Sequence, residues 1–193
     1  MKSKTFAWSA RTLAVLVVAA VSTGVLAQNL EHKTFRGVIN AYSPQTTTTT
    51  GTTTATTGPY EIRGPWSLKF QGDPGKADFF AALNMELSDG WVITENNKDF
   101  DPNARGAHTH HITLVNADVT PITNGLRVTG TAAFTLNGGP APAAIEPSPV
   151  VIEITGGSEV EFSNITLTFE APGSKHFGSA PLPGVVQSVR EER

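Results

Sequence analysis

Alternation of apolar and polar residues with a period of two is the feature that most constrains the fold of this chain. Between residues 60 and 70, the apolar side chains of one parity are Tyr60, Ile62, Trp66, Leu68 and Phe70. The other parity carries charged residues such as Glu61 and Lys69. Because successive side chains of a strand point to opposite faces, the segment is predicted to be a strand with one face in a core and the other in water.

The same alternation recurs along the chain and predicts an all-β fold. Further strand-like segments lie at residues 34–42, 78–87, 91–94, 108–115, 126–136, 150–155, 159–170 and 185–186. Gly, Pro, Asn and Asp residues separate most of them, as in a meander of antiparallel neighbours. After the first 27 residues no segment keeps a helical period of 3.6, so we expect very little helix. The sequence therefore predicts a single antiparallel β-barrel or β-sandwich of about 8–10 strands.

Pro65 bears on the choice between these two architectures. Proline has no N–H to donate to a neighbouring strand, so it predicts that this strand is at a sheet edge or is bulged near its middle. An edge favours a sandwich, whereas a closed barrel has no free edge. The number and spacing of the strands suit a barrel equally well, and the sequence leaves both open.

The first 27 residues have the layout of a secretory signal peptide. A basic start containing Lys2, Lys4 and Arg11 precedes an uninterrupted apolar run over residues 13–20. This run is shorter than the roughly 20 apolar residues that a membrane anchor requires. No second apolar stretch of that length follows, so we expect a mature chain with no membrane span. The predicted destination is the periplasm or the extracellular space.

Charge and cysteine content narrow the classes of function. Cleavage after residue 27 would remove three of the 14 basic residues and none of the 17 acidic ones, which leaves a net charge of −6. An acidic chain without a basic cluster is not expected to bind nucleic acid, because phosphate neutralisation needs grouped Lys and Arg. The absence of cysteine excludes a disulfide framework, a cysteine-ligated zinc site and a cysteine nucleophile.

A threonine-rich tract divides the remaining chain. Ten of the twelve residues from 46 to 57 are threonine. We predict a flexible, hydrated insertion or linker over residues 46–58, since threonine buries too little apolar area to offset its ordering entropy. An O-glycosylated stalk is the alternative. Residues 28–45 then form either a first strand or a detached N-terminal arm, and residues 59–193 form the β-barrel or sandwich domain with a short tail.

The histidines are the only concentrated reactive groups. On a strand, His108 and His110 would project from one face about 7 Å apart, with His111 on the opposite face. Two imidazoles placed in this way can bind one metal ion, and the third ligand must then come from elsewhere in the fold. His176, which lies between Gly173 and Gly178, is the first candidate. Three such ligands suit a divalent transition metal such as Zn, Cu or Fe.

Other readings of the same residues remain open. Glu95, Asp99, Asp101 and His111 are further candidate ligands, and the first three belong to a polar segment, residues 95–107, that is predicted to be a long surface loop. The histidines also suit a role without metal, either in ordinary surface hydrogen bonds or in lining a pocket.

Two classes of function follow from these observations. The first is an exported binding or structural module whose ligand is a small apolar molecule, a glycan or another envelope protein. Aromatic residues of inward parity, such as Trp66, would then line a cavity of the kind that eight-stranded barrels can hold. The alternative is a metal-binding protein or metal-dependent enzyme that uses the His-x-His strand. No catalytic residue stands out, so enzymatic activity stays open, and oligomeric state is not readable from the sequence.

Overall fold

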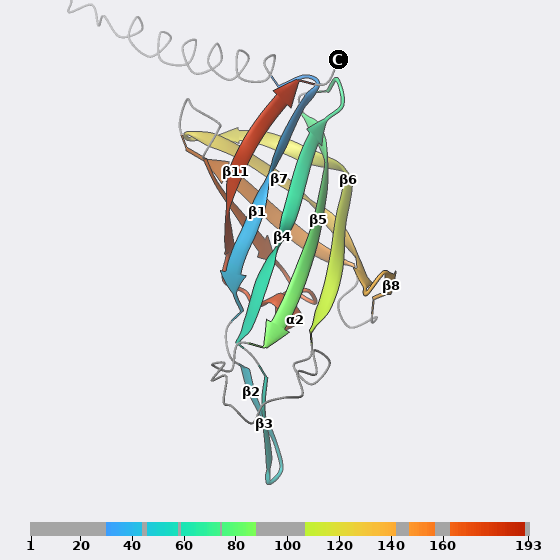
Figure 1. Cartoon of the computed structure of the whole chain (residues 1–193), viewed down its shortest axis with the longest axis vertical. Coiled ribbons are helices and arrows are strands. Elements are labelled where there is room, and N and C mark those ends of the chain that lie inside the picture. The colour runs from blue at the N-terminus through green and yellow to red at the C-terminus, as the bar shows by residue number, and fades with distance from the viewer. Residues whose placement is uncertain are drawn as a thin grey trace, which may run out of the picture.

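The chain forms a closed, antiparallel β-barrel of eight strands, which confirms the predicted all-β class and selects the barrel over the sandwich (Figure 1). The structure is a computed structural model and describes residues 30–43, 46–57, 59–73, 75–87, 107–141, 147–156 and 163–191. The predicted signal peptide, the predicted strand at 91–94 and all of the predicted 95–107 loop except residue 107 lie outside the described residues.

The eight barrel strands follow one another along the chain as a meander. They are β1 (Lys33–Tyr42), β4 (Tyr60–Phe70), β5 (Lys76–Leu87), β6 (His108–Ile122), β7 (Gly125–Leu136), β9 (Ser148–Thr155), β10 (Asn164–Phe169) and β11 (Leu182–Glu191). A short extra strand, β8 (Gly139–Pro140), pairs with the end of β7. Every pairing is antiparallel, as expected when strands neighbouring in sequence are neighbours in space.

Pairing of β1 with β11 closes the barrel, so β4 is not an edge strand as Pro65 suggested. β4 has β1 on one side and β5 on the other. The paired positions of β4 and β5 break off at Gly64 and Pro65 and resume at Trp66 in the same register. The missing N–H therefore interrupts one ladder locally, without a bulge and without an open edge.

Large apolar side chains fill the barrel interior. Those with less than 2% of their surface exposed include Phe35, Phe70, Phe79, Phe169, Phe177, Ile39, Ile62, Leu68, Leu83, Met85, Ile112 and Leu114. In β4 the buried positions, Ile62, Trp66, Leu68 and Phe70, share the parity that the sequence pattern assigned to the core. An eight-stranded barrel has an interior just wide enough for side chains, which matches this filled core.

The threonine-rich tract forms a hairpin between β1 and β4. Its strands are β2 (Thr46–Thr50) and β3 (Thr53–Thr57), which pair with each other and extend away from one end of the barrel (Figure 1). Gly51 occupies the turn with a φ of 63°, a left-handed conformation that glycine adopts without strain. Since β1 is a barrel strand, the hairpin is an insertion between two barrel strands.

One turn of helix, α2 (Ser174–Phe177), lies between β10 and β11 at the same end of the barrel as the hairpin (Figure 1). This end, called the α2 end below, also holds the start of β6. α2 is the only helix in the part of the chain that the structure describes, in agreement with the low helix content expected. The same described segments include no helix with the length and apolar character needed to cross a membrane.

Candidate metal centre

The structure brings His108, His110 and His176 together at the α2 end of the barrel. The Nε2 atom of His176 lies 2.9 Å from Nε2 of His110 and 3.2 Å from Nε2 of His108. One ligand nitrogen from each of the three residues can be chosen so that all lie within 4.8 Å of one another. Residues 68 positions apart in the sequence therefore form one compact group.

The alternation of β6 explains why His108 and His110 share a face. Both have the same parity as the buried Ile112 and Leu114, so they point toward the barrel interior. His110 is only 1% exposed, whereas His108 is partly exposed at the start of the strand. The pair therefore occupies the last interior layer at the α2 end, with His108 nearer to solvent.

His176 reaches this layer because its neighbour Phe177 anchors α2 in the barrel. Phe177 is fully buried, and its ring stacks on Phe134 of β7 and Phe169 of β10, with centroid distances of 5.6 Å and 4.5 Å. The Phe177 ring also contacts the His110 ring edge-on at 5.2 Å. The apolar residue thus fixes a short polar segment against the core and directs His176 toward β6.

A backbone hydrogen bond sets the tautomer of His110. Its Nδ1 atom lies 2.8 Å from the carbonyl oxygen of Thr135 on β7. A carbonyl oxygen only accepts hydrogen bonds, so Nδ1 carries the hydrogen and donates it. In the neutral ring the lone pair is then on Nε2, the atom that faces His176. This is the arrangement that orients metal-binding histidines in general, with the other ring nitrogen bonded to a carbonyl or carboxylate.

Hydrogen bonds among neutral imidazoles do not satisfy both close contacts of His176. The lone pair on Nε2 of His110 requires Nε2 of His176 to be the donor across the 2.9 Å contact. The same Nε2 hydrogen of His176 would also have to be donated to Nε2 of His108 across the 3.2 Å contact. A cation between the three nitrogens would instead use a lone pair from each ring.

The electrostatics of the group favour neutral rings. Burial lowers the pKa of His110 from 6.5 to about 4; the hydrogen bond to the Thr135 carbonyl raises it, and the neighbouring His176 and His108 lower it further. Burial and the neighbouring His108 also lower the pKa of His176. Metal ligands must be unprotonated, so at neutral pH these two imidazoles are already in the ligating form.

Two of the three separations between the ligand nitrogens are close to what a tetrahedral ion demands. Zinc–nitrogen bonds of about 2.0–2.1 Å place neighbouring ligand atoms about 3.3–3.4 Å apart. The 2.9 Å and 3.2 Å contacts of His176 are within a few tenths of an ångström of that separation. The full set of three ligand nitrogens spans up to 4.8 Å, so an ion bound by all three would draw His108 and His110 closer together.

The other predicted ligands do not join this group. His111 has the opposite parity, and its ring lies against Phe80 on the outer face of the barrel at a centroid distance of 5.6 Å. Glu95, Asp99 and Asp101 lie outside the described residues.

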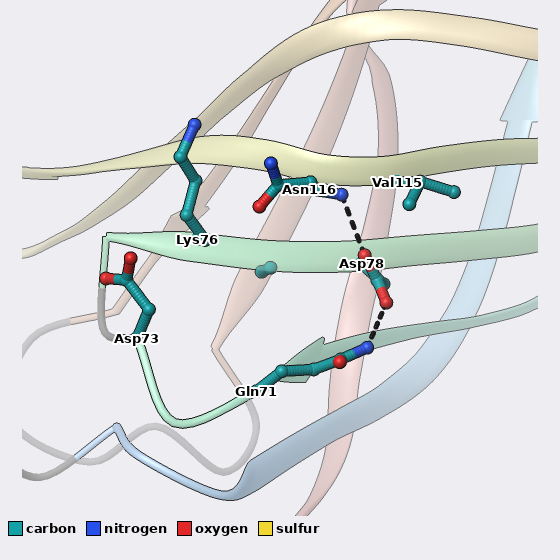
Figure 2. Close-up of a pocket in the computed structure, with 7 residues that line it drawn as sticks. Gln71, Asp73, Lys76, Asp78, Val115 and Asn116 are labelled. Atoms are coloured by element: carbon teal, nitrogen blue, oxygen red, sulfur yellow. Dashed lines mark hydrogen bonds between the residues drawn. The ribbon is translucent and has the colours of Figure 1, made fainter.

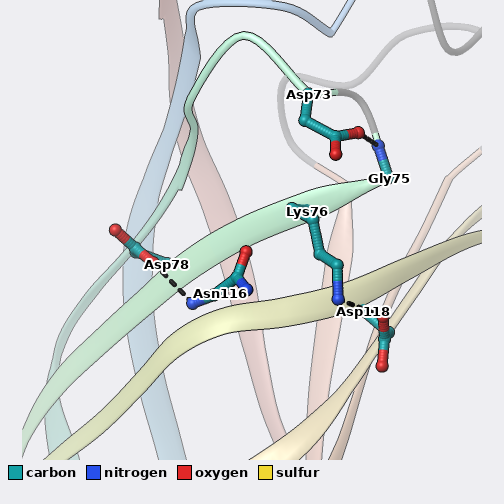
Figure 3. Close-up of polar contacts among 6 residues, drawn as sticks. All are labelled: Asp73, Gly75, Lys76, Asp78, Asn116 and Asp118. Atoms are coloured by element: carbon teal, nitrogen blue, oxygen red, sulfur yellow. Dashed lines mark hydrogen bonds and ion pairs between the residues drawn. The ribbon is translucent and has the colours of Figure 1, made fainter.

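A separate hollow of about 240 Å³ lies on the outside of the barrel near its opposite end. It is lined by Gln71, Asp73, Lys76, Ala77, Asp78, Val115 and Asn116 (Figure 2). Asp78 accepts hydrogen bonds from the Gln71 side chain and from the backbone N–H of Asn116. Lys76 pairs with Asp118 at 2.6 Å (Figure 3). These polar groups bind one another and hold the β4–β5 turn on β6.

Two elements of the site were missed by sequence reasoning. The Thr135 carbonyl is a backbone atom and has no side-chain signature. Phe177 had a readable signal, because a large apolar residue in an otherwise polar, glycine-flanked segment indicates a segment folded onto the core.

Comparisons with models of protein families, with curated proteins and with solved structures found no match for this chain.

Proposed function

We propose that this protein binds a divalent transition metal through His108, His110 and His176 at the α2 end of the barrel. The observation that carries the proposal is the orientation of His110, whose Nδ1–H donates to the Thr135 carbonyl and leaves the Nε2 lone pair facing His176. The close approach of His108 to the same atom of His176 supplies the third ligand.

The ligand set supports zinc, copper or iron, since imidazole suits all three. Three protein ligands leave a fourth position for water or another molecule, as in catalytic zinc sites. The ring of Tyr60 lies edge-on to His108 beside this site, at a centroid distance of 6.0 Å. Metal binding is the activity proposed here.

Export and an extracellular or periplasmic location remain part of the proposal, and they rest on the layout of residues 1–27. The first expectation, a module that binds a small apolar molecule, a glycan or an envelope protein, gains no specific observation from the barrel. Phe35, Phe70 and Phe79 occupy interior space that an apolar ligand would need.

Metal titration of histidine variants tests the proposal. Protein purified without a His tag and stripped with a chelator is expected to bind one equivalent of zinc at pH 7.5. His110→Ala and His176→Ala should each lower the affinity at least about 100-fold, because even loss of an outer partner of a metal ligand costs 10–100-fold. The measurement is isothermal titration calorimetry, supported by the visible spectrum of the cobalt(II) form.

His111→Ala is the matched control, since His111 is adjacent in sequence but lies on the outer face against Phe80. Its zinc affinity should equal that of the wild type. Equal losses in His110→Ala and His111→Ala, or no stoichiometric binding by the wild type, would refute the site.

A further inference from the structure

A methionine lies beside the histidine cluster in the sheet. Met85 of β5 is the direct register partner of His108 of β6, and Leu83 is the partner of His110. Met85 is 1% exposed and belongs to the hydrophobic core, so its side chain, like that of His108, points into the barrel. The thioether and the imidazole therefore occupy the same interior layer on neighbouring strands.

The distance across this pair is within reach of a shared ion. Directly opposite residues of an antiparallel pair have Cβ atoms about 4.5–5.5 Å apart. Methionine has three rotatable side-chain bonds, so its sulfur can be placed over a range of positions around Cβ. Burial keeps water from the sulfur.

The use of methionine in this chain is sparse. The sequence contains two methionines, Met1 and Met85. The buried core of the described residues is otherwise built from Ala, Val, Leu, Ile, Phe and Trp. The one methionine of that core is thus adjacent to the one three-histidine group among the described residues.

We propose that the Met85 sulfur is a fourth ligand of the site and that the site takes copper, as Cu(I). This inference rests on the proposed metal-binding function. A soft thioether selects Cu(I), whereas zinc gains little from it, and imidazoles suit both metals. With three nitrogens and one sulfur the coordination sphere of the copper is complete, as suits a protein that binds and holds the ion.

The plain alternative is that Met85 only fills the core, and Met85→Leu separates the two roles. Leucine keeps the apolar character and approximate volume, and such exchanges usually cost less than about 1.5 kcal/mol. Cu(I) affinity is measured without oxygen by competition with a chromophoric Cu(I) chelator, and zinc affinity by calorimetry. We expect Met85→Leu to lower Cu(I) affinity at least about tenfold while zinc affinity stays within about threefold.

Ile62→Val is the matched control. Ile62 of β4 is the register partner of Met85 on its other side, so the variant disturbs the same layer without touching the sulfur. Its Cu(I) and zinc affinities should equal those of the wild type. The X-ray absorption spectrum of the wild-type copper form should also show a sulfur neighbour that is lost in Met85→Leu.

The outcomes separate this inference from the proposed function. Unchanged Cu(I) affinity in Met85→Leu, or equal losses of Cu(I) and zinc, would overturn the role of Met85 while leaving a histidine metal site in place. Zinc binding without Cu(I) binding by the wild type would also overturn the role of Met85 and leave the histidine metal site in place. Failure of the wild type to bind either metal would overturn the proposed function itself.

Discussion

Zinc in excess over the protein is expected to raise its thermal unfolding midpoint by about 10 °C. The site joins β6 to α2, and α2 is attached to β10 and β11 on the far side of the barrel, since four pairings separate β6 from β11 in either direction around the ring. A bound metal ion would therefore link β6 to the opposite side of the barrel, where β10 and β11 lie. Free zinc at 1,000 times its dissociation constant stabilises the folded state by about 4 kcal/mol. For a domain of this size, each kcal/mol raises the unfolding midpoint by about 2–4 °C.

Circular dichroism melting curves with and without zinc measure this shift. A chelator should reverse it, and His176→Ala should abolish it because the variant removes the ligand that α2 contributes. His111→Ala should retain the full shift. A zinc-induced shift that survives in His176→Ala would show that the ion stabilises the protein from another site.

The metal-free protein is expected to lose stability as pH falls below 6.5. The folded-state pKa of His110 is lowered to about 4, so the folded state disfavours the protonated ring that the unfolded chain accepts near pH 6.5. A group of this kind stabilises the fold fully above its unfolded pKa, and the contribution disappears as pH falls toward the folded value. Between pH 7.5 and pH 5 the loss from His110 is roughly 2 kcal/mol. The lowered pKa of His176 acts in the same direction.

Urea unfolding in the presence of a chelator measures the effect. His110→Gln removes the titrating group, so its free energy of unfolding should fall by roughly 2 kcal/mol less than that of the wild type over the same pH range. His111→Gln should behave as the wild type. Parallel pH profiles for the wild type and His110→Gln would show that His110 is not held neutral by the fold.

Much of the fold could be predicted because each strand buries one face. The alternation in residues 60–70 matches the bounds of β4, and the common face of His108 and His110 follows from the same period of two. The meander order also follows from short turns between consecutive strands. These are local properties, and a local pattern is what a sequence shows directly.

Closure of the barrel depends on pairings that no local pattern displays. β11 was predicted only as residues 185–186, since Pro183 and Gly184 interrupt its alternation, yet it extends from Leu182 to Glu191 because β1 and β10 pair with it on both sides. The edge predicted from Pro65 was wrong for the same reason, because β4 gains both of its partners from the closed ring.

Predicting the site requires both the local sequence pattern and the long-range packing of the strands. The sequence indicated His176 as a candidate, but its approach to His110 depends on Phe177 packing between Phe134 and Phe169, which come from distant strands. The pairing of Met85 with His108 is a matter of strand register, which sequence alone does not fix when two long strands are separated by a long intervening segment.

The most direct test of a three-histidine metal site is the X-ray absorption spectrum of the protein loaded with one equivalent of zinc. Three imidazole nitrogens at about 2.0–2.1 Å, with the multiple scattering of histidine rings, are the predicted coordination. In His176→Ala the count of imidazoles should fall by one. A zinc shell of oxygen atoms alone, or one unchanged in His176→Ala, would contradict the assignment of His108, His110 and His176 as the ligands.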